Sequence, residues 1–351
     1  MPVSGSSPAV DVNWRTPHFE KMLYNQALLS RAYIEAWEAT SRPRYARAAT
    51  RCFDYVLRDM TAPGGAFYTA EDADNLDSHG KREEGEFYVW SPEQTRDALG
   101  DEANFAIAAL GLEEAPTLEA GPVAHLRPGT SVDFATLDPL LDLLRIARDA
   151  RNRPIRDEKV IAGWNGLMIR ALAEGGAALG RSDYITAATS AYDDALARLS
   201  GSGGLARIEA GGERREEAGL EDHAWLGLAA LALFDATNEA QWLSAAELQA
   251  DALSAFDHSD ALKMTRTDGP LGPVCDTDDG AVPSGQSSAL EFLARLDARA
   301  PNAARRDRAQ RLAAALSGAV VKQPILRPLT LTASAILQMG ETGTRVAHGP
   351  A

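Results

Sequence analysis

The chain has 351 residues, of which 45% are hydrophobic and 24% are charged, and its formal net charge at pH 7 is −15. This composition is typical of a globular protein and excludes a disordered or collagen-like chain. The negative charge argues against a nucleic-acid partner, because the phosphate backbone would be repelled.

The N-terminus and the cysteines restrict the cellular setting. Residues 1–12 (MPVSGSSPAVDV) contain neither a basic region nor a long apolar one, so the sequence predicts no signal peptide. Since no apolar run is long enough to span a bilayer, we expect no membrane partner and a cytoplasmic protein. The two cysteines, Cys52 and Cys275, form no metal-binding spacing. We therefore expect no metal site and no cofactor.

The first predicted elements in chain order form a helical hairpin. An apolar helix is predicted from Tyr24 (YNQALLSRAYIEAWEAT), and Tyr45 opens a second, amphipathic helix. Further along, Ala66–Thr69 and Glu86–Trp90 alternate aromatic with other residues and flank an acidic loop, which predicts a short β-hairpin. The segment Leu118–Pro139 lacks periodicity and predicts a long surface connection.

The helical-hairpin pattern then repeats about every 60 residues. Buried inner helices that alternate with amphipathic outer helices predict an all-α toroid of the (α/α)6 type, with a straight solenoid as the main alternative. We predict a single domain over residues 1–351, with an irregular tail at 340–351. The repeated apolar helices open at Trp164, His223 and Ser284. An aromatic residue opens the helix that follows the first two of them: Tyr184 after the helix from Trp164, and Trp242 after the helix from His223.

Four segments that each open an inner helix carry the candidate binding residues. If the helices form a ring, these helix starts lie at one end of it and direct their N–H groups to one cavity mouth. Aromatic and polar side chains together suit a sugar, since rings pack on its C–H faces and polar groups bind its hydroxyls. Taken singly, each of these residues fits a helix cap or a core position better than a binding role, and it is the convergence of four segments that favours binding. The predicted substrate-binding residues are Trp14, Tyr24, Asn25, Trp90, Lys159, Trp164, Asn165 and Ser284.

Six ordered segments resemble the signature segments of one protein family. They read TPHFEKMLYNQALL, FYTAEDADN, EGEFYVWSPEQ, RPIRDEKVIAGWNGLMIRALA, LEDHAWLGLAALALFDAT and DDGAVPSGQSS. The family includes bacterial YyaL-like proteins and vertebrate spermatogenesis-associated protein 20. It joins an N-terminal thioredoxin-like domain to an α/α toroid similar to that of six-hairpin glycosidases and sugar 2-epimerases. The resemblance implies this fold and, more loosely, a carbohydrate-related role, since a fold does not fix function.

This sequence also departs from the family pattern at several points. The thioredoxin-like domain and the first hairpin of the toroid have no counterpart, so we expect a toroid that is incomplete at its N-terminal end, with short β-hairpins in its rim loops. Such an open ring exposes apolar side chains near Leu23–Leu29 and Ile325–Leu337, which favours a homo-oligomer or a separate thioredoxin-like partner. His223 stands where the family usually has tyrosine.

Proton transfer on a small-molecule sugar is the first predicted activity. In an epimerase or isomerase, His18 and His223 would exchange a proton at the carbon next to the sugar carbonyl, because histidine titrates near neutral pH. Glu20 and Asp222 would orient the two histidines. These four residues are therefore predicted to be catalytic.

Glycoside hydrolysis is the other enzymatic prediction. Two carboxylates among Asp72, Asp157 and Asp222 would act as acid and base across a gap that holds one water molecule. The non-enzymatic alternative is a binding or scaffold module, or an inactive truncated member of the family. The sequence leaves these alternatives open, because it does not say which carboxylates lie close together.

Overall fold

The computed structural model of this protein describes residues 16–76, 80–116, 118–126, 132–270 and 272–339. Trp14 and the tail 340–351, on which two of the predictions fall, lie outside these described residues. The chain divides into two compact units, which are described separately below. The single domain over residues 1–351 stays a prediction. Unit 1 comprises Met1–Asn25 and Ala70–Asp157, and unit 2 comprises Gln26–Thr69 and Glu158–Ala351.

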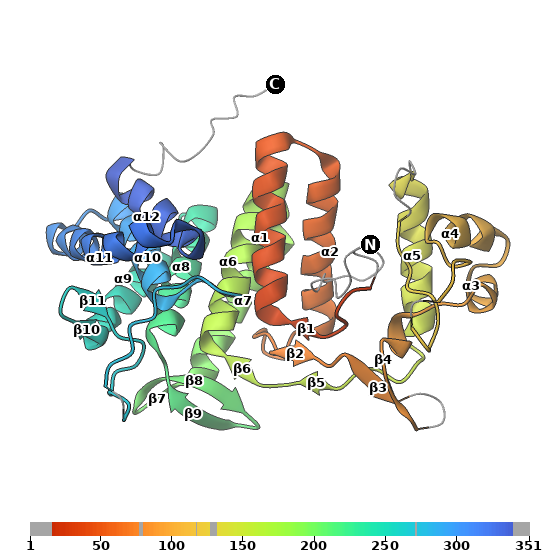
Figure 1. Ribbon diagram of the computed structural model, residues 1–351, viewed down its shortest axis with the longest axis horizontal. Coiled ribbons are helices and arrows are strands. Elements are labelled where there is room, and N and C mark those ends of the chain that lie inside the picture. Colours follow the sequence, from red (N-terminus) through yellow and green to blue (C-terminus); the bar gives the residue numbers. More distant parts are fainter. Residues whose placement is uncertain (1–15, 77–79, 117, 127–131, 271, 340–351) are drawn as a thin grey trace. The chain divides into compact units, whose positions relative to one another are not determined.

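The predicted helical hairpins are confirmed (Figure 1). The predicted aromatic residues Tyr45, Tyr184 and Trp242 each lie in the first turn of the second helix of a hairpin. The hairpins are α1 (Leu23–Thr40) with α2 (Pro43–Asp59), α6 (Ala162–Leu179) with α7 (Ser182–Leu199), α8 (Leu220–Thr237) with α9 (Ala240–Ala252), and α10 (Gly285–Arg299) with α11 (Ala303–Lys322), followed by η4 (Pro324–Leu326) and α12 (Pro328–Met339).

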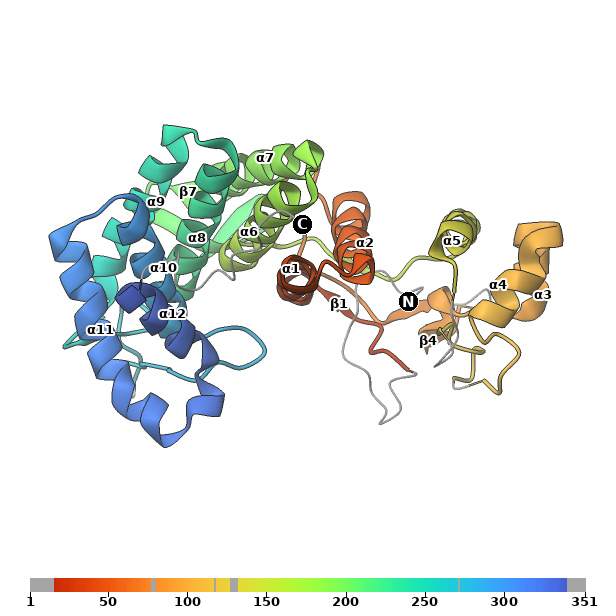
Figure 2. The ribbon, with the colours of Figure 1, turned by 90° about the horizontal axis from the view of Figure 1, so that it is seen from above.

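The helices of unit 2 from α6 to α12 form the two predicted layers. α6 packs on α8, α8 on α10, and α10 on α12, and α6 and α8 are buried around most of their circumference. Figure 2 shows α7, α9 and α11 on the outside of this row. In α11, only Ala309, Leu312 and Leu316 are buried, which is the single stripe expected of an outer helix.

Close packing between the inner helices depends on glycine. A Cβ atom added to Gly166 in α6 would lie 2.7 Å from the carbonyl carbon of Trp225 in α8. Because backbone atoms cannot swing aside as a side chain can, Gly166→Ala is expected to lower the free energy of unfolding by about 2–3 kcal/mol. Denaturant unfolding measures this change.

Gly318 in the outer helix α11 is the matched control. An added Cβ there would meet nothing within 4 Å. Gly318→Ala is therefore expected to stabilise the protein by about 0.5–1 kcal/mol, since alanine favours the helix. If both substitutions changed stability in the same direction, the packing argument would be wrong.

Unit 2 also contains a small antiparallel sheet; the sequence analysis predicted short β-hairpins in rim loops but did not place one here. Its hairpin β8–β9 turns through Gly211 and Gly212, whose φ angles are 61° and 85°. Two consecutive residues with positive φ form the turn that matches the twist of paired strands, so the Gly-Gly pair was the available sequence signal. The strands are β6 (Val160–Ile161), β7 (Ser200–Gly201), β8 (Gly204–Ala210) and β9 (Glu213–Glu217), and beyond η3 (Leu253–Phe256) a separate hairpin pairs β10 (Asp257–His258) with β11 (Ala261–Leu262).

The β-hairpin predicted between Ala66–Thr69 and Glu86–Trp90 is wrong. Glu86–Tyr88 forms one 3-10 turn, η1, and the side chain of Asn75 accepts a hydrogen bond from the Phe87 N–H at 3.0 Å. A side chain thus binds a backbone group that a strand partner would otherwise take. The hairpin lies inside the acidic loop instead, where β3 (Asp74–Leu76) pairs with β4 (Arg82–Glu84).

The remainder of unit 1 combines a short sheet with three helices. The surface connection predicted over Leu118–Pro139 is wrong at its end, because α5 begins at Phe134. Asp133 caps this helix by accepting a hydrogen bond from the Ala135 N–H at 3.0 Å. The other elements are β1 (Lys21–Met22), β2 (Ala70–Glu71) and β5 (Arg156–Asp157) in the order β1-β2-β5, and α3 (Pro92–Leu99), η2 (Gly100–Glu102), α4 (Ala103–Ala109) and α5 (Phe134–Arg148).

Candidate functional site

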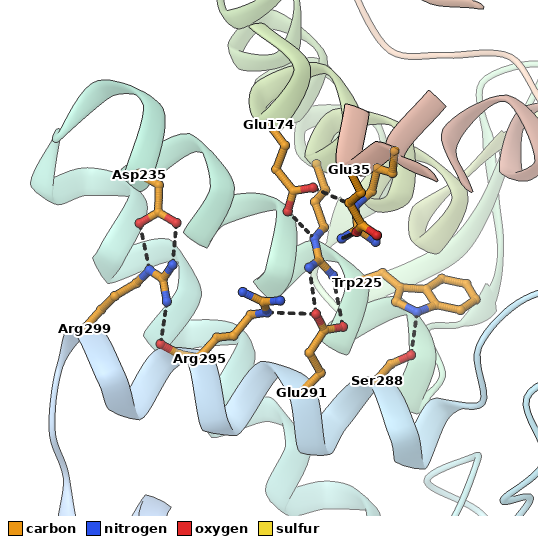
Figure 3. Close-up of polar contacts among 10 residues, drawn as sticks. Glu35, Glu174, Trp225, Asp235, Ser288, Glu291, Arg295 and Arg299 are labelled. Carbon is orange, nitrogen blue, oxygen red and sulfur yellow. Dashed lines mark hydrogen bonds and ion pairs between the residues drawn. The ribbon is translucent and has the colours of Figure 1, made fainter. Parts of the chain in front are cut away.

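The starts of the inner helices α6, α8 and α10, which were predicted to carry site residues, meet in unit 2. The Gly163 N–H in α6 donates to Asp222 Oδ1 in α8 at 2.9 Å. Trp225 Nε1 in α8 donates to Ser288 Oγ in α10 at 2.8 Å (Figure 3). These contacts join the first turns of α6, α8 and α10, so the N-terminal ends of the three inner helices lie together.

Asp222 is fully buried at this junction. Its Oδ2 atom accepts hydrogen bonds from the Gly219 N–H at 2.8 Å and from Arg207 on β8 at 3.0 Å. Burial raises the pKa of Asp222 to about 6, although Arg207 and the two backbone N–H groups favour the charged form. The hydrogen-bond partners of Asp222 are therefore groups that fix the starts of α6 and α8, and they do not include His223.

Replacing Asp222 by asparagine is expected to lower the free energy of unfolding by about 3 kcal/mol. The amide cannot accept at both ends, so a buried N–H group or the Arg207 guanidinium loses its partner. Asp251→Asn, at an exposed position in α9, is the matched control and should change stability by less than about 0.5 kcal/mol. Equal effects of the two substitutions in thermal or denaturant unfolding would contradict this assignment.

Two other predicted residues of unit 2, Asn165 and Ser284, also bind backbone groups. The Asn165 side chain is buried, accepts from the Phe67 N–H at 2.7 Å and donates to the Phe67 carbonyl at 3.0 Å. Ser284 caps α10 by accepting from the Ser287 N–H at 3.1 Å. Ser284 thus takes the N-cap position that the sequence allows, whereas Asn165 lies inside α6 and does not cap it. Lys159 and Trp164 are half-buried.

His223 differs from these residues because one of its ring nitrogens has no hydrogen-bond partner. The residue is 3% exposed, and Nδ1 lies 2.8 Å from Oε1 of Gln249 on α9. Nε2 is buried and has no partner among the described residues. Burial lowers the pKa of His223, Gln249 raises it and Arg266 lowers it, so the imidazole is neutral at neutral pH. A neutral imidazole with a bare nitrogen can accept a proton.

The residues predicted in unit 1 take separate positions. His18 and Glu20 are exposed, and His18 Nδ1 accepts from the Glu20 N–H at 3.2 Å. Asp72 is half-buried and pairs with Arg82 at 2.6 Å, which holds one oxygen of this predicted catalytic carboxylate in an ion pair. Trp90 is buried, and the Arg151 guanidinium lies 4.3 Å from its ring centroid. Tyr24, Asn25 and Asp157 are half-buried.

The sequence analysis missed a buried polar group formed by Lys21, Glu71 and Tyr88. Lys21 is 1% and Glu71 2% exposed, and they stand opposite each other on β1 and β2. The Tyr88 hydroxyl donates to Glu71 Oε1 at 2.5 Å, while Lys21 Nζ lies 3.6 Å from the Tyr88 ring centroid. Side chains alternate along an extended segment, so the residues next to the predicted His18 and Glu20 are the ones that point inward.

A ladder of alternating charges links α1, α6 and α10 (Figure 3). Arg31 Nε donates to Glu174 at 2.6 Å, and Arg170 Nε donates to the same carboxylate at 2.8 Å. Arg170 also binds Glu291 through both Nη atoms, at 2.7 and 3.1 Å. Arg295 Nε completes the ladder by donating to Glu291 at 2.8 Å. We call these five residues the charge ladder.

Both carboxylates of the charge ladder stay ionised. Burial raises the pKa of Glu174, but Arg170 and Arg31 outweigh it and lower the pKa to about 2. Burial acts on Glu291 in the same way, and Arg170 and Arg295 hold its pKa well below the usual range. An ionised carboxylate cannot donate the proton that glycoside cleavage needs, so the ladder supports the helices and does not supply an acid.

Two features are absent from the described part of the chain. No helix there combines the length and apolar character needed to cross a bilayer. No three His, Cys, Asp or Glu side chains in residues 16–339, apart from the gaps given above, are grouped to hold a metal ion.

A known protein sequence is similar to most of this chain. Spermatogenesis-associated protein 20 of Homo sapiens is 31% identical to it, over 82% of this chain and 43% of the human protein. The chain thus spans less than half the length of this relative. No family model matches the chain.

Solved structures give the fold class. A sugar epimerase from a ruminal bacterium has a TM-score of 0.57 at 11% identity, over 90% of this chain and 66% of that one. Cellobiose 2-epimerase from Spirochaeta thermophila has a TM-score of 0.55 at 11% identity, over 91% and 63%. The predicted fold class is thereby confirmed as the six-hairpin glycosidase-like α/α toroid.

Proposed function

Because the chain belongs to the family of spermatogenesis-associated protein 20, whose C-terminal portion it matches, and shares the toroid fold of sugar epimerases, we propose that it moves a proton on a sugar. The reaction is epimerisation or isomerisation at the carbon next to the carbonyl. The observation that carries the proposal is His223, whose neutral ring is held by Gln249 with Nε2 bare. It lies in the first turn of an inner helix, where the sequence pattern places sugar-binding residues.

Each group in the proposed step has one role. The lone pair of His223 Nε2 takes the proton as the C–H bond breaks, and the electron pair of that bond moves toward the carbonyl oxygen. Once the intermediate has turned its other face to Nε2, return of the proton to C2 gives the epimer. Return of the proton to the former carbonyl carbon, with the O2 hydroxyl proton passing to O1, gives the isomer. His18, Asp72 and Asp157 remain further candidates for the predicted catalytic roles. Asp222 also remains a candidate, but both of its oxygens already accept hydrogen bonds.

Hydrogen–deuterium exchange tests this function directly. The purified chain is incubated with cellobiose or D-glucose in D₂O at neutral pH, and the C2–H signal is followed by proton NMR. We expect that signal to disappear with time in the presence of the chain and to persist with heat-denatured chain. If neither these sugars nor their N-acetyl forms exchange while the protein remains folded, the proton-transfer function is wrong.

A binding module is the second candidate, favoured by the surface of α11, η4 and α12. Val321 is 83% and Ile325 is 86% exposed, and a groove of about 900 Å³ lies between α10, α11 and α12. Exposed apolar surface of this kind marks sites of protein interaction. Light scattering tests it: a dimer that Ile325→Asp converts to a monomer supports the module, and a monomer at all concentrations contradicts it.

A further inference from the structure

We propose that Gln249 is the positioning residue for His223, fixing the imidazole proton on Nδ1 so that Nε2 remains the proton acceptor. The catalytic consequence rests on the proposed function, whereas the state of the ring does not. Gln249 lies on the outer helix α9 and His223 on the inner helix α8. The contact therefore reaches from the outer layer of unit 2 to the residue proposed to react.

The direction of the hydrogen bond follows from the atoms that meet. Oε1 of Gln249 is a carbonyl oxygen, which accepts hydrogen bonds and does not donate them. Nδ1 of His223, 2.8 Å away, must therefore carry the proton. In a neutral ring only one nitrogen is protonated, so Nε2 presents its lone pair. Nε2 has no hydrogen-bond partner among the described residues, so no group there competes with Gln249 for the position of the ring proton.

The surroundings of the ring keep it neutral and hold it in place. Phe256 packs against it with ring centroids 5.7 Å apart and planes at 56°. Arg266 and Glu217 form an ion pair at 2.6 Å nearby. The charge of Arg266 lowers the pKa of the imidazole, and the charge of Glu217 raises it. Phe256 restricts the ring from one side and Gln249 from another. A ring flip would put Cδ2 in the place of Nδ1 and Cε1 in the place of Nε2, and it would break the contact with Gln249.

The cost of the arrangement also points to a role. A buried acceptor without a partner costs about 1–3 kcal/mol relative to one that is satisfied. Gln26 also has buried side-chain atoms without partners among the described residues, so what distinguishes His223 is its place in the first turn of an inner helix. Asn165, Asp222 and Ser284, at the same end of the inner helices, have hydrogen-bond partners. The unpaired nitrogen of His223 contrasts with them.

NMR of the full chain labelled with [¹⁵N]histidine tests the proposal without any substrate. Long-range ¹H–¹⁵N correlations distinguish a protonated ring nitrogen from a bare one, and a His223→Phe sample identifies the His223 signals. We expect a protonated Nδ1 and a bare Nε2 in the wild type. A bare Nδ1 in the wild type would overturn the assignment.

Two substitutions of Gln249 and one control complete the experiment. Gln249→Leu removes the acceptor at similar volume, so the proton is expected to move to Nε2, the position that a free imidazole favours. Gln249→Glu keeps an oxygen beside Nδ1 and should retain the Nδ1 proton. Gln241→Leu, at an exposed position of the same helix, should change nothing. An unchanged ring in Gln249→Leu would refute the positioning role.

Activity separates this inference from the proposed function. If the wild type exchanges the sugar C2–H, Gln249→Leu should slow that exchange by about 10²-fold or more, because a wrongly protonated base cannot accept the proton. Gln249→Glu should recover part of the rate. If the wild type shows no exchange but the ring proton moves as expected, the proposed function fails and the positioning role stands.

Discussion

Replacing His223 by phenylalanine is expected to lower the rate of sugar C2–H exchange by about 10²–10⁴-fold, the usual contribution of a positioned proton acceptor. Phenylalanine keeps a ring against Phe256 but has no nitrogen that could accept a proton. The half-buried Gln249 amide loses one partner, so stability should fall by only about 1–2 kcal/mol. Deuterium exchange and denaturant unfolding on the same sample separate the two effects.

His258→Gln is the control for this substitution. His258 lies in β10, in the same unit, and is exposed, so its replacement should leave the exchange rate and the stability unchanged. If His223→Phe retained the wild-type exchange rate, another group would have to accept the proton, and the assignment of His223 would be wrong. Loss of exchange in both variants would point to a nonspecific effect of changing histidines in the rim of unit 2.

Replacing Glu291 by glutamine is expected to lower the free energy of unfolding by about 3–5 kcal/mol, the largest stability effect predicted for this chain. Arg170 binds Glu291 through two nitrogens and is almost completely buried. Without the carboxylate, a buried guanidinium loses the charge that compensates its removal from water. Urea unfolding followed by circular dichroism measures the difference.

Two controls show whether burial causes this effect. Arg311 forms an ion pair with Asp307 on the exposed face of α11, and Arg311→Gln should cost no more than about 1 kcal/mol. The double variant Arg170→Met, Glu291→Met removes both buried charges and should cost less than Glu291→Gln alone. A double variant less stable than the single one would show that the charge ladder is stabilising in itself.

The charge ladder also predicts how stability depends on pH. The pKa of Glu174 is lowered from 4.5 in the unfolded chain to about 2, and that of Glu291 is lowered as well. A carboxylate whose pKa is lower in the folded chain than in the unfolded chain stabilises the fold. This stabilisation is complete above the pKa of the unfolded chain and is lost as the pH falls through the pKa of the folded chain. We expect wild-type stability to fall as the pH drops below about 4.5. In Glu291→Gln the fall should be shallower, and an identical slope would contradict the assignment.

The helical hairpins could be predicted because their signals are local. The apolar helix from Trp164 and the aromatic residue that opens the next helix lie within one stretch of chain, and hydrophobic periodicity reports which face is buried. The turn at Gly211–Gly212 and the cap at Asp133 were equally readable, since both depend on the residue type at one position. The pattern even placed His223 in the first turn of an inner helix.

The contacts that give these residues their roles could not be predicted, because they join distant parts of the chain. Arg31 and Glu174 are 143 residues apart, and Arg170 and Glu291 are 121 apart. Whether His18 or Lys21 points inward depends on how side chains alternate along the segment, and that segment is too short for its hydrophobic pattern to show a period. The sequence by itself thus determined the repeated helical hairpins and their order, but it did not show α5, which begins inside a predicted connection. Tertiary structure decided which side chains are buried together, and only there did His223 acquire Gln249 and a bare nitrogen, because hydrogen bonds and desolvation depend on neighbours in space.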